Sequence, residues 1–177
     1  VGAWVLNAGM SSGHRPGAAA AQTLSDIAHL PSLAAEATLL MSAGCAGSIL
    51  ASAFPESWAG AIADGLWGRP FLAILALIGM LIAMALAGVH PVLTSVFLAS
   101  TFTPPVLGLP PIVHFCTILA GWGLSAALTP FSVLSMTASR FSGLSLARIS
   151  IVANWRYTFA CVALFTLALA GFVTLRA

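Results

Sequence analysis

Apolar residues gather into four long segments, which are separated by shorter stretches rich in glycine, proline and serine. Each segment approaches the roughly 20 apolar residues that a helix needs to cross a bilayer. The segments are Leu33 to Phe54, Pro70 to Val89, Pro111 to Leu128 and Tyr157 to Leu175. This pattern predicts an all-α, polytopic integral membrane protein with about four or five membrane helices.

The composition agrees with this prediction. Of the 177 residues, 60% are hydrophobic and only 6% are charged, and the mean hydropathy is +1.05. A soluble domain usually carries about 25% charged residues. The net charge of +2 gives no indication of nucleic-acid binding. Three cysteines lie far apart in apolar segments, so we expect small buried side chains without a disulfide or metal role: Cys45, Cys116 and Cys161.

The N-terminal part of the chain differs from the rest. We expect residues 1–32 to comprise the end of a preceding helix and a polar connector, followed by a membrane domain over residues 33–177. The chain has no initiator Met and opens inside an apolar stretch, so we expect it to be the C-terminal part of a longer protein. Within the segment 33–54, the pairs Ala43/Gly47 and Gly44/Ser48 predict close packing against another helix.

Two connections indicate how the chain meets the membrane surface. Residues 55–69 include two tryptophans and suit an interfacial connector, because tryptophan prefers headgroup depth. Residues 139–156 hold three of the six arginines, and positive charge favours the cytoplasmic side. We therefore expect a multi-pass protein of the cell inner membrane in which loop 139–156 is cytoplasmic. The arginines are Arg140, Arg148 and Arg156.

The first interruption of the apolar pattern is the sequence GVHP at residues 88–91. Proline suits the first position of a helix, so a half-helix from Pro91 to Thr101 is predicted. Its first amides would be unpaired and would form an anion site inside a membrane protein. Segment 70–103 is therefore either a spanning helix followed by a shorter one or a re-entrant hairpin. The distribution of arginines fits both.

Three polar side chains accompany this first interruption. Thr94 and Ser95 lie within the first turn and a half of the predicted half-helix and would add hydroxyl groups to the site. His90 is the ionisable side chain at the break. It either relays a proton or binds an anion when charged, or it caps the hairpin by bonding to backbone.

The second interruption lies at Thr129 and Pro130, which break the predicted helix over residues 111–140. Downstream of it, Ser132, Ser135 and Ser139 recur at helical spacing on one face. A serine stripe in an apolar helix should face protein or water rather than lipid. Transporters often build their binding sites from discontinuous helices, whose termini hold anions and whose unwound carbonyls hold cations.

The stretches "GVHPVLTSVFLAS" and "ALTPFSV", followed by a basic loop and a last helix over residues 157–175, resemble the C-terminal repeat of the ion transporter superfamily. This superfamily includes divalent-anion symporters, arsenite permeases and the large permease subunits of tripartite transporters. The resemblance covers residues 33–175 and implies a re-entrant hairpin and an unwound helix whose tips meet at the substrate. It implies substrate contacts at Gly88, Val89, His90, Pro91, Thr129, Pro130 and Ser132, near which Thr94, Ser95 and Ser135 also lie.

The resemblance implies the C-terminal half of a secondary active transporter that moves a small anionic solute. Gly-Val-His-Pro replaces the Ser-Asn-Thr signature of the sodium-coupled carboxylate carriers, so the coupling ion stays open between sodium and protons. The expected partners are the lipid bilayer, the solute and a missing N-terminal half or partner subunit; a homodimer stays open. The alternative is a non-transporting membrane subunit or scaffold. With no nucleophile motif, nucleotide fingerprint or metal-binding pattern, we expect neither enzymatic activity nor a further cofactor.

Overall fold

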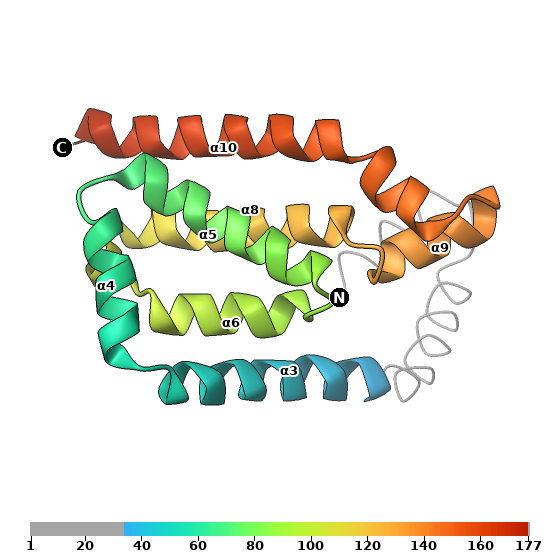
Figure 1. Ribbon diagram of the computed structural model, residues 1–177, viewed down its shortest axis with the longest axis horizontal. Coiled ribbons are helices and arrows are strands. Elements are labelled where there is room, and N and C mark those ends of the chain that lie inside the picture. The colour runs from blue at the N-terminus through green and yellow to red at the C-terminus, as the bar shows by residue number, and fades with distance from the viewer. Residues whose placement is uncertain (1–33, 177) are drawn as a thin grey trace, which may run out of the picture. The chain divides into compact units, whose positions relative to one another are not determined.

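The computed structural model describes residues 34–176, and every regular element in this part of the chain is a helix (Figure 1). The all-α prediction is confirmed. The expected connector over residues 1–32 lies outside the described residues. The chain divides into two units, and the boundary between them falls within α3 (Ala34–Ala53), after Ser42. The elements are α3 (Ala34–Ala53), α4 (Glu56–Leu66), α5 (Pro70–Leu86), α6 (Pro91–Thr101), α7 (Pro104–Leu107), α8 (Pro111–Leu128), α9 (Val133–Ser142), a π-helix (Arg148–Val152) and α10 (Trp155–Arg176).

Several helices have the length and composition of membrane spans. Pro111–Ser142 and Trp155–Leu175 are each long and apolar enough to cross a bilayer. Ala37–Ala53 and Glu56–Leu66 form a third span if the bent pair is counted as one. α5 and α6 are apolar but shorter, with 17 and 11 residues. The chain is therefore a helical membrane protein with two or three candidate spans and a helical hairpin formed by α5 and α6.

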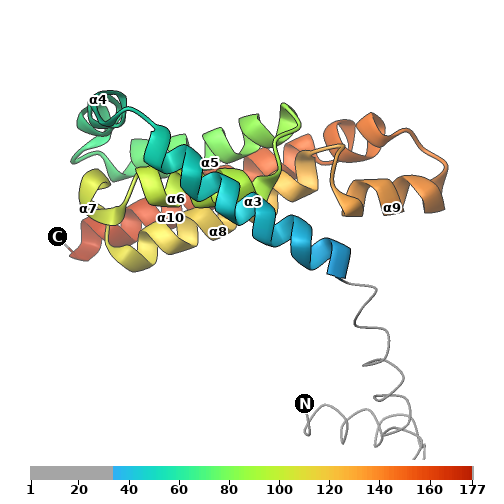
Figure 2. The ribbon, with the colours of Figure 1, turned by 90° about the horizontal axis from the view of Figure 1, so that it is seen from below.

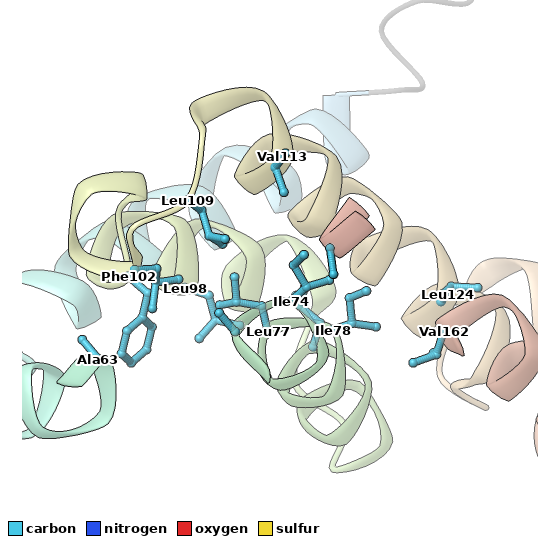
Figure 3. Packing of buried hydrophobic residues seen from close by; sticks show 14 residues of the cluster. Ala63, Ile74, Leu77, Ile78, Leu98, Phe102, Leu109, Val113, Leu124 and Val162 are labelled. Carbon is cyan, nitrogen blue, oxygen red and sulfur yellow. The ribbon is translucent and has the colours of Figure 1, made fainter. Parts of the chain in front are cut away.

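Helix α5 lies at the centre of this arrangement and contacts α8, α10 and α6. It is apolar on every side, and its buried residues recur every three or four positions, as packing against several helices requires. These residues are Ala73, Ile74, Leu77, Ile78, Leu81 and Ala85. Figure 3 shows the core that results, in which side chains from α4, α5, α6, α8 and α10 pack together. We call α5, α6, α8 and α10 the bundle.

Helix α4 runs across the bundle. It stands upright in Figure 1, where the bundle helices run horizontally, and it is seen end-on in Figure 2. Its axis is bent by 91° from that of the helix before it. Trp58 and Trp67 are largely exposed at this end of the bundle. This arrangement suits a helix that lies in the plane of the membrane surface.

Small residues allow the closest helix contacts. A Cβ atom on Gly47 would lie 2.7 Å from the carbonyl oxygen of Leu93 on α6, whereas Gly44 has nothing within 4 Å of the same position. Of the two small-residue pairs predicted to pack, the one that includes Gly47 therefore makes the close contact. Cys45 on the same helix is exposed, and the prediction that all three cysteines are buried was wrong. An apolar residue in a membrane helix can face lipid as readily as protein, so the sequence does not distinguish the two.

Replacing Gly121 should separate α5 from α8. A Cβ atom there would collide with Leu81 Cδ1 and lie 3.3 Å from the Ile78 Cα atom, whereas Gly123 on the same helix has nothing within 4 Å. Gly121→Leu should lower the free energy of unfolding by about 1–3 kcal/mol, the usual cost of overpacking. Gly123→Leu is the matched control and should have little effect. The measurement is unfolding in mixed detergent micelles. Equal loss in both variants would contradict this close crossing.

Candidate functional site

The end of α5 forms a turn that requires glycine. Gly88 has a φ of +87°, which residues with a side chain rarely adopt. The amide of Val89 donates to the carbonyl of Met84 at 2.9 Å, and the amide of Gly88 donates to that of Ala85 at 3.1 Å. These two bonds define a Schellman motif, which satisfies carbonyl groups that the end of the helix would otherwise leave unpaired. The turn therefore stops α5 and returns the chain into α6.

His90 caps the helix that follows. Its Nδ1 atom accepts a hydrogen bond from the amide of Val92 at 3.3 Å, and Pro91 occupies the first position of α6, as predicted. The accepting Nδ1 must be unprotonated in this arrangement. Of the roles considered for His90, the structure shows the cap. The imidazole ring thus takes one of the amides that a bound anion would otherwise use.

The second interruption is held by hydroxyl groups. α8 ends at Leu128, Thr129 is its C-cap in an extended conformation, and Pro130 lies in the gap before α9. Ser132 caps α9 by accepting from the amide of Ser135 at 3.1 Å. The hydroxyl of Ser135 donates to the carbonyl of Thr129 at 2.9 Å. Two residues of the serine stripe, Ser132 and Ser135, therefore satisfy the backbone of this break, whereas Ser139 donates to the carbonyl of Leu144 at the other end of α9.

The two interruptions meet. The Thr129 hydroxyl donates to the carbonyl of Ala85, at the end of α5, at 2.9 Å, although the two residues are 44 positions apart in the chain. The same hydroxyl accepts from the amide of Phe131 at 3.3 Å. The Phe131 ring lies 3.6 Å from where a Cβ atom on Gly88 would be, and so covers the hairpin turn. We call residues 85–91 together with residues 127–135 the junction.

The junction lies near one end of the bundle and not halfway along it. α5 and α8 contain 17 and 18 residues before they stop. At 1.5 Å per residue they are about 26 and 27 Å long, close to the roughly 30 Å of a bilayer core. Asn154, just before α10, donates from Nδ2 to the carbonyl of Ala127 at 3.2 Å, so α10 begins at the same level.

The hydroxyl groups of α6 differ from those of the junction because they have no partner. The oxygens of Thr94, Ser95 and Thr101 are buried and make no hydrogen bond in the described part of the chain. Thr94 also borders a cavity of about 280 Å³ between α3, α5 and α6. The rest of the lining is apolar and includes Leu50, Phe54, Met84, Leu93 and Phe97. Thr94 and Ser95 therefore lie beside the junction but make no bond to it.

Two further polar side chains, His114 and Asn154, bond backbone carbonyls at the ends of the bundle. For His114 in its apolar segment, the sequence predicts a bond to a neighbouring helix. His114 Nε2 lies 2.8 Å from the carbonyl of Phe102, to which it must donate because a carbonyl can only accept. The expectation that His114 bonds a neighbouring helix is thus confirmed, but the sequence did not identify the acceptor. Asn154 was expected only to anchor entry to the last helix. A polar side chain beside an apolar segment indicates that it forms a hydrogen bond. The acceptor cannot be identified from the sequence, because every residue has a backbone carbonyl.

The junction brings together helix ends of both polarities. The C-terminal ends of α5 and α8 carry partial negative charge, and the N-terminal ends of α6 and α9 carry partial positive charge. Carbonyl and hydroxyl oxygens such as those of Ala85 and Thr129 suit a small cation, and first-turn amides suit an anion. The junction can bind a cation or an anion only if these oxygens or amides give up their present hydrogen bonds and bind the ion instead.

A substitution at His90 tests the cap. His90→Ala removes the acceptor of the Val92 amide and should lower the free energy of unfolding by about 1 kcal/mol. His90→Asn is the matched variant, because asparagine is a strong N-cap residue and should restore most of this loss. Unfolding in mixed micelles provides the measurement. If His90→Asn is as unstable as His90→Ala, the imidazole does not act as a cap.

No protein-family model, no curated protein and no solved structure matches the chain. The resemblance to the ion transporter superfamily therefore stays a prediction based on the motifs at residues 88–91 and 129–132. Any function has to be inferred from the junction and the helices that form it.

Proposed function

We propose that this chain forms the C-terminal half of a secondary active transporter that moves a small anionic solute across the inner membrane. In this proposal the junction is the gate, and loop 139–156 faces the cytoplasm. The observation that carries the proposal is the contact between the two interruptions, in which the Thr129 hydroxyl bonds the Ala85 carbonyl at 2.9 Å. Discontinuous helices that meet in this way are a common basis of transporter binding sites.

The gate proposal is supported by the kind of bonds that close the junction. Each break keeps its own cap, through His90 in α6 and through Ser132 in α9. Among the hydrogen bonds of the described residues, the one from Thr129 to Ala85 joins the two breaks. Breaking it would leave the Ala85 carbonyl bonded to the Gly88 amide and the Thr129 oxygen bonded to the Phe131 amide, while each break remains capped. The two breaks can therefore separate without unfolding either helix end.

Coupling to protons or sodium can be assigned to different parts of the junction. Protonation of His90 at Nδ1 would convert the acceptor of the Val92 amide into a donor, which frees that amide for an anion. A sodium ion would use the oxygens of Ala85, Thr129 and Ser135 instead, because these are hard neutral ligands. His90 thus supports proton coupling, and the oxygen cluster supports sodium coupling.

The second candidate function is a non-transporting subunit or scaffold, and one observation favours it. The hydroxyls of Thr129, Ser132 and Ser135 all have partners within the junction. Capping alone therefore accounts for each of them. In this case the junction would be a rigid contact that holds the helices of the bundle together. The exposed apolar faces would pack against other subunits.

Thr129→Val tests the gate. Valine has the shape of threonine without the hydroxyl, so it removes the bond to Ala85 and should lower solute uptake roughly tenfold, which corresponds to about 1.4 kcal/mol. The assay is uptake by the full-length protein in proteoliposomes, with labelled di- and tricarboxylates and oxyanions and with an imposed sodium or proton gradient. Thr137→Val is the matched control, because Thr137 is exposed on α9, and it should transport normally.

Two results would refute the gate. If the wild type moves none of these solutes under either gradient, the scaffold explanation is favoured. If the wild type transports and Thr129→Val transports equally well, the solute path does not pass the junction. Dependence of the flux on the sodium or on the proton gradient identifies the coupling ion.

A further inference from the structure

Three of the arginines lie at the end of the bundle opposite to the acidic residues of α4. Glu56 and Asp64 both belong to α4, and residues 65–177 contain no acidic residue. Arg140 belongs to α9, Arg148 begins the π-helix and Arg156 lies in the first turn of α10. Figure 1 shows α4 and α9 at opposite ends of the bundle. The carboxylates of α4 therefore lie at the other end of the bundle from these three arginines (Figure 1).

The elements that carry these arginines follow the junction along the chain. α8 stops at the junction, and α9 and the π-helix follow before α10 returns through the bundle. The π-helix contacts α8, α9 and α10, which brings the three arginine-bearing elements together. α10 has 22 residues and a length of about 33 Å, so its two ends reach the two membrane surfaces. An α10 that spans the bilayer places Arg156, in its first turn, at headgroup depth.

Helix α9, which carries Arg140, has exposed apolar side chains. On α9, the exposed fractions are 74% for Val133, 66% for Leu134 and 89% for Phe141. Arg140 lies in the last turn of the same helix and is exposed as well. Arg156 lies over the ring of Trp155, 5.3 Å from its centroid. Exposed apolar residues suit acyl chains, and guanidinium groups beside them suit phosphate.

We propose that α9, the π-helix and the first turn of α10 form a binding surface for an anionic phospholipid. Arg140 and Arg148 bind the headgroup phosphate, and Arg156 adds positive charge at the same surface. The acyl chains lie against the outward apolar residues of α9. A lipid phosphate supplies negative charge to these arginines, and an attraction of this kind increases with each arginine near the surface. The surface does not depend on the proposed transport, because none of its arginines belongs to the junction.

The test uses the full-length protein in detergent, titrated separately with phosphatidylglycerol, phosphatidylcholine and sodium phosphate, with bound molecules counted by native mass spectrometry. The wild type should bind phosphatidylglycerol more tightly than phosphatidylcholine. Arg140→Gln and Arg148→Gln should each weaken phosphatidylglycerol binding about fivefold. Arg69→Gln is the matched control, because it removes the same charge at the opposite end of the bundle and should leave binding unchanged. Arg148→Lys should retain most of the binding, since it keeps the charge.

Four results would overturn the proposal. Equal affinity for the two lipids would exclude charge selection. Equal weakening by Arg69→Gln would show an effect of net charge and not of this surface. Unchanged binding in both glutamine variants would place the lipid elsewhere. Tight binding of inorganic phosphate without phosphatidylglycerol selectivity would identify a site for the free anion. Circular dichroism of each variant separates these results from a loss of α9.

Discussion

Backbone carbonyl groups at helix ends inside a membrane protein need donors, and this requirement shapes the junction. α5 and α8 stop beside each other, so carbonyls of two helices compete for donors in one place. Turn amides satisfy Met84 and Ala85 on α5, and the Thr129 hydroxyl adds a second bond to Ala85. Asn154 satisfies Ala127 on α8. Without these donors each free carbonyl would cost several kcal/mol in a lipid environment.

The close helix crossings help to supply these donors. Packing between membrane helices depends on shape, because lipid is as apolar as a leucine side chain. Gly121 lets α8 approach α5, and Gly47 lets α3 approach α6. The approach of α8 to α5 places Thr129 within bonding distance of Ala85. The close packing of α8 against α5 and the hydrogen bonding of the α5 end are therefore linked. The first places the Thr129 hydroxyl where it can donate to the Ala85 carbonyl.

The junction and the arginine-bearing surface divide the polar chemistry of the bundle. The junction uses neutral oxygens and amides, which can hold an ion only by exchanging existing bonds. The surface formed by α9, the π-helix and the start of α10 uses the permanent charge of three arginines. The two proposals thus rest on different polar groups: neutral groups at the junction and guanidinium groups at the surface.

The sequence by itself determined the helical membrane class, the positions of both breaks and the residues able to cap them. Long apolar runs, proline at Pro91 and Pro130, and serine at helical spacing each act locally, and local patterns can be read from neighbouring residues. Only the tertiary structure decided that Thr129 bonds Ala85, that Gly47 and not Gly44 makes the close contact, and that the junction lies at one end of the bundle. A backbone carbonyl has no sequence signature, and an apolar residue suits lipid and protein alike, so these pairings arise only when the helices pack.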